Sequence, residues 1–272
     1  MKYFDTHMHL DDEKFDIDRE DVIKKMQVAG VKACINMGCN IESSKKAIEL
    51  ANEHSFIYAA CGIHPEDLPE NITDFEKNPQ IEQNVWKTLE EIENLAKENK
   101  KVVAIGEIGL DYYWRQNNKE FQKEVFIKQI EIANRLSLPI SIHTREAIDD
   151  TIQILRRYKI NKHGVLHCCP FNPELVRQGL QAGLYIAFGG TSTFKSSKNA
   201  QKIVEMVPLD KILVETDSPY LAPEPVRGTR NDSSNLKYIV KRLAEFRGMS
   251  EEEMGDITYK NAEKLFIENK EK

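Results

Sequence analysis

Six side chains of the kinds that bind metal ions are spread through the sequence, each near the end of a predicted β-strand. Five different strands contribute them, so a fold that gathers strand ends would bring them together. Imidazoles and carboxylates gathered in this way can hold divalent cations, which activate water for hydrolysis. The six candidate ligands are His7, His9, Glu107, His143, His167 and Asp217.

The first two candidates, His7 and His9, are separated by one residue in a β-rich segment. Alternate side chains of a strand point to one face, so both imidazoles and Asp5 are expected on the same face. Two such imidazoles can chelate one cation, and Asp5 could orient one of them. The pattern alone also fits two polar strand residues without a metal. Its position at the exit of the first strand favours the metal site.

The other four candidates follow or close apolar segments. Taken singly, Glu107 could cap a loop, His143 and His167 could be hydrogen-bonded core residues, and Asp217 could begin a turn. All four would nevertheless occupy the same end of successive strands. We therefore favour one shared site over four unrelated structural roles.

The number of ligands predicts two divalent cations. A catalytic zinc site needs about three protein ligands and a water molecule. Four histidines and two carboxylates exceed that number and suit a binuclear centre in which one carboxylate bridges; Glu107 stands where a bridging group at the end of the fourth strand would lie. Imidazole ligands favour Zn, Mn, Fe or Ni, and Mg remains a candidate because metal availability can override the preference.

The elements that must position these ligands alternate between strands and helices, which predicts an α/β fold, a single (β/α)₈ TIM barrel with an extra C-terminal helix. An open eight-stranded sheet would fit the same alternation, and closure is inferred from the ligand placement. The predicted strands are 3–8, 31–37, 56–61, 102–106, 139–142, 164–168, 184–188 and 212–216. The predicted helices are 19–29, 43–54, 85–98, 119–137, 146–158, 173–182, 197–207, 235–247 and 251–268.

One domain is expected over 1–272, with the barrel at about 3–250, the terminal helix at about 251–268 and a long loop at 66–84. The net charge of −6 argues against general attraction to nucleic acid or anionic membranes, although bound cations would add local positive charge. Five cysteines without a disulfide spacing, and an N-terminus unlike a signal peptide, predict reduced thiols in a cytoplasmic protein. No apolar run approaches the ~20 residues of a membrane span, and no obligate protein partner is evident.

Five ordered motifs resemble those of the TatD family, metal-dependent hydrolases and deoxyribonucleases of the amidohydrolase superfamily. The resemblance runs from residue 3 to about 267, where 261–266 is similar to the family's terminal helix. The motifs are Asp5-Thr6-His7-Met8-His9-Leu10, Gly62-Ile63-His64-Pro65, Gly106-Glu107-Ile108-Gly109-Leu110-Asp111-Tyr112, His143-Thr144-Arg145 and Glu215-Thr216-Asp217-Ser218-Pro219-Tyr220-Leu221.

The resemblance implies a division of the ligands between two cations. One would be held by His7, His9, Glu107 and Asp217, and the second by Glu107, His143 and His167. Two segments depart from the family pattern. The loop 168–172 reads Cys-Cys-Pro-Phe-Asn where Cys-Phe-Ser-Gly is usual, and Thr229 stands where a lysine is common. Neither departure changes a ligand.

The resemblance also implies catalytic roles. Asp217 would accept a proton from the attacking water, and His64 would contact the substrate phosphate or assist proton transfer; otherwise His64 is a turn histidine before a proline. Arg145, Arg227 and Arg230 are candidate phosphate contacts, because guanidinium groups match phosphate oxygens.

The resulting hypothesis is hydrolysis of phosphodiester bonds in DNA, with single strands or frayed ends suiting a barrel mouth. Tyr112, Tyr113 and Trp114 could stack a base or simply cover the barrel top. The alternatives are an amide or ester hydrolase with the same metal centre and, in a different class, a non-catalytic metal-bound scaffold. Retention of Asp217 argues against the scaffold, because binding alone does not require a base.

Overall fold

Eight parallel strands follow one another in chain order in the computed structural model, which describes residues 1–70 and 79–268. The strands are β1 (Tyr3–Met8), β2 (Val31–Met37), β3 (Ile57–Cys61), β4 (Val102–Asp111), β5 (Ile140–Arg145), β6 (Gly164–Leu166), β7 (Leu184–Phe188) and β8 (Ile212–Val214). A parallel bridge between Met8 and Ser218 brings the first strand beside the chain that leaves the last. This contact closes the sheet into the predicted barrel.

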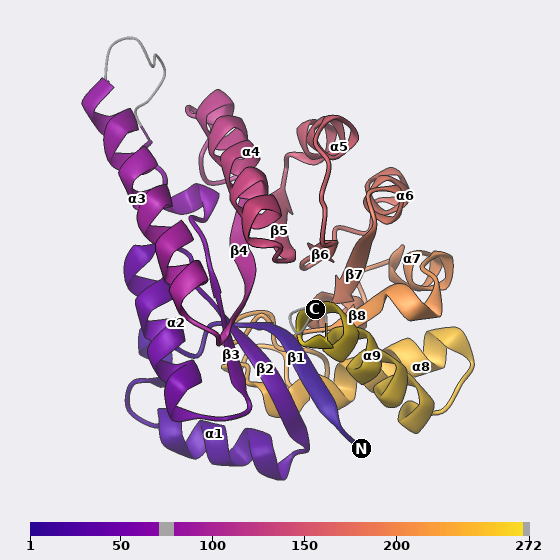
Figure 1. The fold of residues 1–272 in the computed structure, drawn as a ribbon. Coiled ribbons are helices and arrows are strands. Elements are labelled where there is room, and N and C mark those ends of the chain that lie inside the picture. Colours follow the sequence, from indigo (N-terminus) through magenta and orange to yellow (C-terminus); the bar gives the residue numbers. More distant parts are fainter. Residues whose placement is uncertain (71–78, 269–272) are drawn as a thin grey trace.

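Helices connect consecutive strands and form a ring around them (Figure 1). They are α1 (Arg19–Val28), α2 (Ile41–Glu53), α3 (Pro79–Glu98), α4 (Lys119–Leu136), α5 (Ile148–Arg157), α6 (Pro173–Gln181), α7 (Ala200–Met206), α8 (Leu236–Arg247) and α9 (Glu251–Phe266). Polar residues at the N-termini explain where several of these helices begin. Asn40 and Ser250 each form a capping box with the residue three positions later, which satisfies backbone N–H groups of the first turn.

Two predicted boundaries were wrong in ways that affect the site. Strands β4 and β5 extend further toward the mouth than predicted, so Glu107 and His143 lie within strands rather than at their ends. The register shifts between Ile105 and Ile108, and backbone pairing then continues to Asp111 and Arg145. In the predicted loop 66–84, α3 already begins at residue 79, and 71–78 lie outside the described residues.

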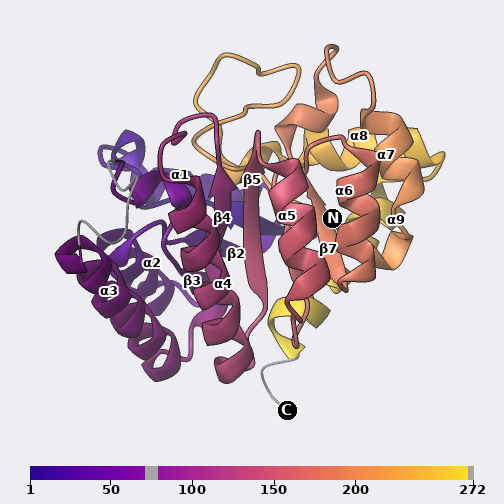
Figure 2. The same cartoon turned by 90° about the horizontal axis from the view of Figure 1, so that it is seen from above.

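The core has two apolar layers. Large aliphatic and aromatic side chains fill the space between strands and helices, while alternate strand residues such as Phe4, Ile35 and Leu213 fill the barrel interior. The additional helix α9 covers one end of that interior, where Phe266 packs against Phe4 with ring centroids 6.3 Å apart. Figure 2 shows the last turn of α9 at the end opposite to the long connection after β8. The other end of the barrel is thereby left open for the candidate ligands.

Candidate metal centre

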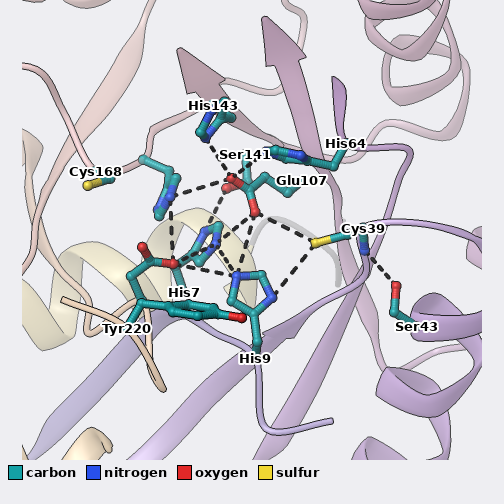
Figure 3. Close-up of polar contacts among 12 residues, drawn as sticks. His7, His9, Cys39, Ser43, His64, Glu107, Ser141, His143, Cys168 and Tyr220 are labelled. Atoms are coloured by element: carbon teal, nitrogen blue, oxygen red, sulfur yellow. Dashed lines mark hydrogen bonds and ion pairs between the residues drawn. The ribbon is translucent and has the colours of Figure 1, made fainter. Parts of the chain in front are cut away.

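Glu107 lies at the centre of the gathered ligands and presents a different oxygen to each side (Figure 3). Its Oε2 lies 3.2 Å from His7 Nε2 and 3.7 Å from His9 Nε2. Its Oε1 lies 3.0 Å from His143 Nδ1 and 3.5 Å from His167 Nε2. The structure thus brings Glu107 between two pairs of imidazoles, in the arrangement that a bridging carboxylate needs.

The side of Glu107 that faces His7 and His9 is compact. His7 Nε2 and His9 Nε2 lie 3.3 Å apart, and Asp217 Oδ1 lies 3.7 Å from the first and 3.5 Å from the second. Four atoms that bind one tetrahedral zinc at 2.0–2.2 Å must lie about 3.3–3.6 Å from one another. The distances that join the two imidazoles to each other and to the carboxylates of Glu107 and Asp217 fall between 3.2 and 3.7 Å. This donor set fits a single divalent cation.

The other side is wider. His143 and His167 each face Glu107 Oε1, and their ring centroids are 6.3 Å apart, compared with 5.1 Å for the rings of His7 and His9. Asp217 Oδ1 lies 3.9 Å from His167 Nε2, so this carboxylate borders both sides. The donor types again suit a transition-metal cation. We refer to the His7–His9 side as the first position and to the His143–His167 side as the second position.

His64 approaches the second position but differs from the candidate ligand histidines. Its Nε2 lies 3.5 Å from Glu107 Oε1, while its Nδ1 accepts a hydrogen bond from the Glu66 backbone N–H at 3.2 Å. A neutral imidazole carries one proton, so the ring nitrogen that accepts leaves the proton on the other. His64 Nε2 is consequently a donor in this tautomer and has no lone pair for a cation.

Burial and opposite charges set the protonation of the centre. Burial alone would raise the pKa of Glu107, but the imidazoles of His7, His64 and His167 hold it well below its ordinary value. Burial would lower the pKa of His143, yet hydrogen bonds with Asp111 and Glu107 raise it to about 9. The pKa of His167 rises to about 8, because Glu215 and Glu107 outweigh burial. Protons and cations therefore compete for these imidazoles.

A cavity of about 1390 Å³ opens over the centre. Of the three predicted phosphate contacts, Arg145 lines it, and among the described lining residues it is the only arginine or lysine. Its guanidinium stacks on the Tyr113 ring at 4.0 Å. Arg227 and Arg230 lie elsewhere: the first covers the Phe194 ring at 4.2 Å, and the second forms a bidentate pair with Asp18 at 2.9 and 2.6 Å.

Comparisons with known proteins identify the family of the chain. The family model described as TatD related DNase matches residues 4–267. The chain belongs to the TatD family of metal-dependent hydrolases. It is 39% identical over 264 residues to the metal-dependent hydrolase YabD of Bacillus subtilis, with 97% of this chain and 98% of YabD covered. It is 36% identical over 270 residues to the metal-dependent hydrolase YcfH of Escherichia coli K12, with 98% and 96% covered.

A solved structure agrees with the TatD assignment. The crystal structure of YjjV, a TatD homologue from E. coli K12, superposes with a TM-score of 0.86 at 27% identity and covers 97% of each chain. In the described part of this TatD protein, all five cysteines are free thiols. Among the same residues, no helix has the length and apolar character needed to cross a membrane.

Local backbone geometry explains how distant strands of the TatD chain meet at the centre. Gly109 pairs with His143 between β4 and β5, and a Cβ at Gly109 would lie 2.0 Å from the His143 carbonyl oxygen. Only glycine permits this approach. Asp217 adopts a left-handed φ of 57° at the turn after β8, and its N–H donates to the His7 carbonyl at 2.9 Å. These contacts fix β4 to β5 and the β8 exit to β1.

The predicted role of Asp5 was wrong. Its buried carboxylate accepts hydrogen bonds from the backbone N–H of Thr216 at 2.9 Å and of His7 at 3.3 Å, and from the Ser233 hydroxyl at 2.6 Å. It therefore binds the His7 backbone and not the His7 ring. The sequence placed Asp5 on the correct face of β1, but the polar groups that surround it come largely from segments more than 200 residues away.

Three side chains of the centre were missed as individual candidates. Asp111 Oδ2 lies 3.0 Å from His143 Nε2, and Glu215 Oε2 lies 3.1 Å from His167 Nδ1. Cys39 Sγ lies 3.8 Å from His9 Nδ1, and burial raises the pKa of this thiol to about 12, so that it stays protonated at neutral pH. The sequence could have identified Asp111 and Glu215. Each lies an even number of residues from a predicted ligand in the same strand motif, and such residues share one face of a strand.

Proposed function

We propose that this TatD protein hydrolyses phosphodiester bonds in DNA, using two divalent cations held by the six ligands. The observation that carries the proposal is the position of Glu107, with one oxygen toward each pair of imidazoles. When bound, such cations lower the pKa of a water molecule and stabilise negative charge on phosphoryl oxygens. The family description as a DNase and the presence of Arg145 in the cavity wall support a phosphodiester substrate.

The chain's own residues supply the proton transfers. Asp217 is the base: burial would raise its pKa, but the hydrogen bond with His9 and the charges of His167 and His7 lower it, so it is ionised at neutral pH. It takes a proton as the water oxygen bonds to phosphorus. His64 donates a hydrogen bond from Nε2 to a phosphoryl oxygen, and the leaving oxygen takes a proton from solvent as the phosphorus–oxygen bond breaks. Arg145 contacts a neighbouring phosphate.

Exposed aromatic rings favour a single strand or a frayed end as the bound form. Trp114, which lines the cavity, is 54% exposed, and the neighbouring Tyr113 is 49% exposed. Unpaired bases can stack on such rings, whereas the bases of an intact duplex cannot reach them. The five free cysteines fit our further proposal that the protein works in the reducing cytoplasm.

The test is a parallel assay of metal-reconstituted protein on defined single-stranded oligonucleotides, a small phosphodiester and a panel of N-acyl and ester compounds. Glu107→Gln, purified in the same way, controls for contaminating nuclease. We expect metal-dependent cleavage of the oligonucleotide by the parent only. Cleavage confined to the N-acyl or ester compounds would replace the proposal with an amide or ester hydrolase. A fully metal-loaded protein without turnover on any compound would favour a scaffold.

A further inference from the structure

The histidines of the second position have charged partners on their outer sides. His143 Nε2 lies 3.0 Å from Asp111 Oδ2, and His167 Nδ1 lies 3.1 Å from Glu215 Oε2. Both carboxylates are almost completely buried, with exposed fractions of 0% and 1%. Hydrogen bonds to an ionised acceptor are about twice as strong as neutral ones. Each imidazole is therefore hydrogen-bonded to a buried carboxylate through one ring nitrogen, while its other nitrogen faces Glu107.

The histidines of the first position have neutral partners instead. Ser141 Oγ lies 3.4 Å from His7 Nδ1, and the Cys39 thiol lies 3.8 Å from His9 Nδ1. The contact with Ser141 is long for a hydroxyl, and the Cys39 thiol is a weak hydrogen-bonding group. The compact first position is set by the spacing of two histidines at the end of one strand, whereas the wider second position draws one histidine from β5 and one from the end of β6.

Backbone donors fix which oxygen each outer carboxylate offers. Asp111 Oδ1 accepts the N–H groups of Tyr113 at 2.9 Å and Trp114 at 2.8 Å, which leaves Oδ2 for His143. Glu215 Oε1 accepts the Cys168 N–H at 2.6 Å, which leaves Oε2 for His167. Since a carboxylate can only accept, the imidazole nitrogen facing it must carry the proton.

We propose that Asp111 and Glu215 are positioning residues that fix the tautomer and ring orientation of His143 and His167. The second position depends on them directly, and the first only through the His7 ring, which stacks on His167 with centroids 3.4 Å apart. The inference rests on the two-cation centre of the proposed function. It assigns the proton to His143 Nε2 and His167 Nδ1. The lone pairs at His143 Nδ1 and His167 Nε2 are then directed toward Glu107, where a cation would be held.

Substitution by the matching amide should reverse the tautomer. In Asp111→Asn the amide oxygen stays with the two backbone N–H groups, so its NH₂ group faces His143 Nε2. That nitrogen must then accept, and the proton moves to Nδ1, the atom needed for the cation. In Glu215→Gln the Cys168 N–H retains the oxygen, and the NH₂ group drives the proton of His167 to Nε2 for the same reason.

The experiment measures Mn²⁺ binding by calorimetry and elemental analysis for the parent, Asp111→Asn and Glu215→Gln. Loss of an outer partner typically lowers metal affinity about 10–100-fold. We expect this loss of Mn²⁺ affinity in the binding step of the second position. The affinity of the other step should stay within about threefold of the parent value. Nitrogen–proton correlation spectra of the metal-free proteins, recorded above the pKa values of about 9 and about 8 so that both rings are neutral, should show the proton moved to His143 Nδ1 or His167 Nε2. Asp149→Asn, which removes a charge from the cavity wall without contacting a histidine, should retain both steps.

Asp111→Ser separates positioning from simple support. It removes more of the side chain than Asp111→Asn but presents no amide NH₂, so it should weaken Mn²⁺ binding less. Unchanged binding in both amide variants, equal weakening of both steps, an unchanged tautomer, or a larger loss in Asp111→Ser would each overturn the inference. No readout involves substrate. A protein that cleaves no phosphodiester but shows the tautomer reversal would refute the proposed function and leave this inference standing.

Discussion

The two positions of the centre are built differently. The first takes both histidines from the end of β1 and its carboxylate from the turn after β8, which hydrogen-bonds back to β1. The second takes one histidine from β5 and one from the end of β6, with rings 6.3 Å apart and a buried carboxylate behind each. A compact set of donors can be defined by local spacing along the chain. A wider set requires additional hydrogen bonds to hold each ring.

The largest expected effect comes from Asp217, which borders both positions. Asp217→Asn should reduce turnover on a phosphodiester by at least about 10³-fold, because an amide cannot accept the proton of the attacking water. Kinetics must accompany elemental analysis, with variant and parent compared at equal metal content. Near-parent turnover at equal occupancy would mean that another group is the base and that Asp217 belongs to the first position only as a ligand.

His64 tests whether a histidine beside the second position can act without holding metal. His64→Ala should keep both cations and the fold while losing about 10²–10³-fold in turnover, as expected when a hydrogen-bond donor to the charged transition state is removed. His54→Ala, a histidine whose Nε2 lies 3.6 Å from Glu20 away from the cavity, is the matched control and should retain parent turnover. Loss of a cation in His64→Ala would place it among the ligands, and unimpaired turnover would remove its catalytic role.

The pH dependence of metal binding should differ between the two positions. In the metal-free protein the pKa values of His143 and His167 are raised to about 9 and about 8, so both rings are protonated below pH 8. At the first position the pKa of His9 is raised but that of His7 is lowered, so one proton must leave. Each released proton makes affinity fall about tenfold per pH unit of acidification.

We therefore expect the Mn²⁺ affinity of the second position to fall about 100-fold per unit below pH 8, and that of the first about tenfold. Calorimetry in buffers of different ionisation enthalpy would count the protons released at each step. Equal proton release at both steps would show that the two positions do not differ in this respect.

The smallest effect is expected for Arg145, which is not one of the candidate metal ligands. Arg145→Ala should raise KM for an oligonucleotide about tenfold with little change in kcat, as expected for loss of one charge-assisted hydrogen bond. Arg227→Ala is the matched control, because this side chain lies over Phe194 and does not line the cavity. A larger effect in Arg227→Ala than in Arg145→Ala would reverse the assignment of the phosphate contact.

Much of the fold, and the gathering of the six candidate ligands at one mouth, could be predicted from the sequence because both follow local patterns. The strand–helix alternation indicates the barrel, and strand ends in a parallel barrel share one mouth. The ends of β4 and β5 could not be predicted, because backbone pairing with a neighbouring strand extends them past their apolar segments. The partners of Asp5 come from near residues 216 and 233, and nothing in its neighbourhood along the chain identifies them.

The arginines show the same limit. Arg145 follows His143 on β5, so its place at the mouth could be inferred from strand periodicity. Arg230 lies in a long connection, where its bidentate pair with Asp18 depends on a contact across 212 residues. Sequence reasoning identified the chemistry of a guanidinium group but could not identify which acid it meets.

The most direct test of the two-position account is a titration of metal-free protein with Mn²⁺ that records bound metal per chain and phosphodiester turnover together. The account predicts saturation at two cations per chain, with full turnover only when both positions are filled. Glu107→Gln, which removes the negative charge shared by both positions, should weaken both binding steps and abolish turnover. Saturation at one cation with full turnover, or two cations retained with parent affinity in Glu107→Gln, would contradict the account.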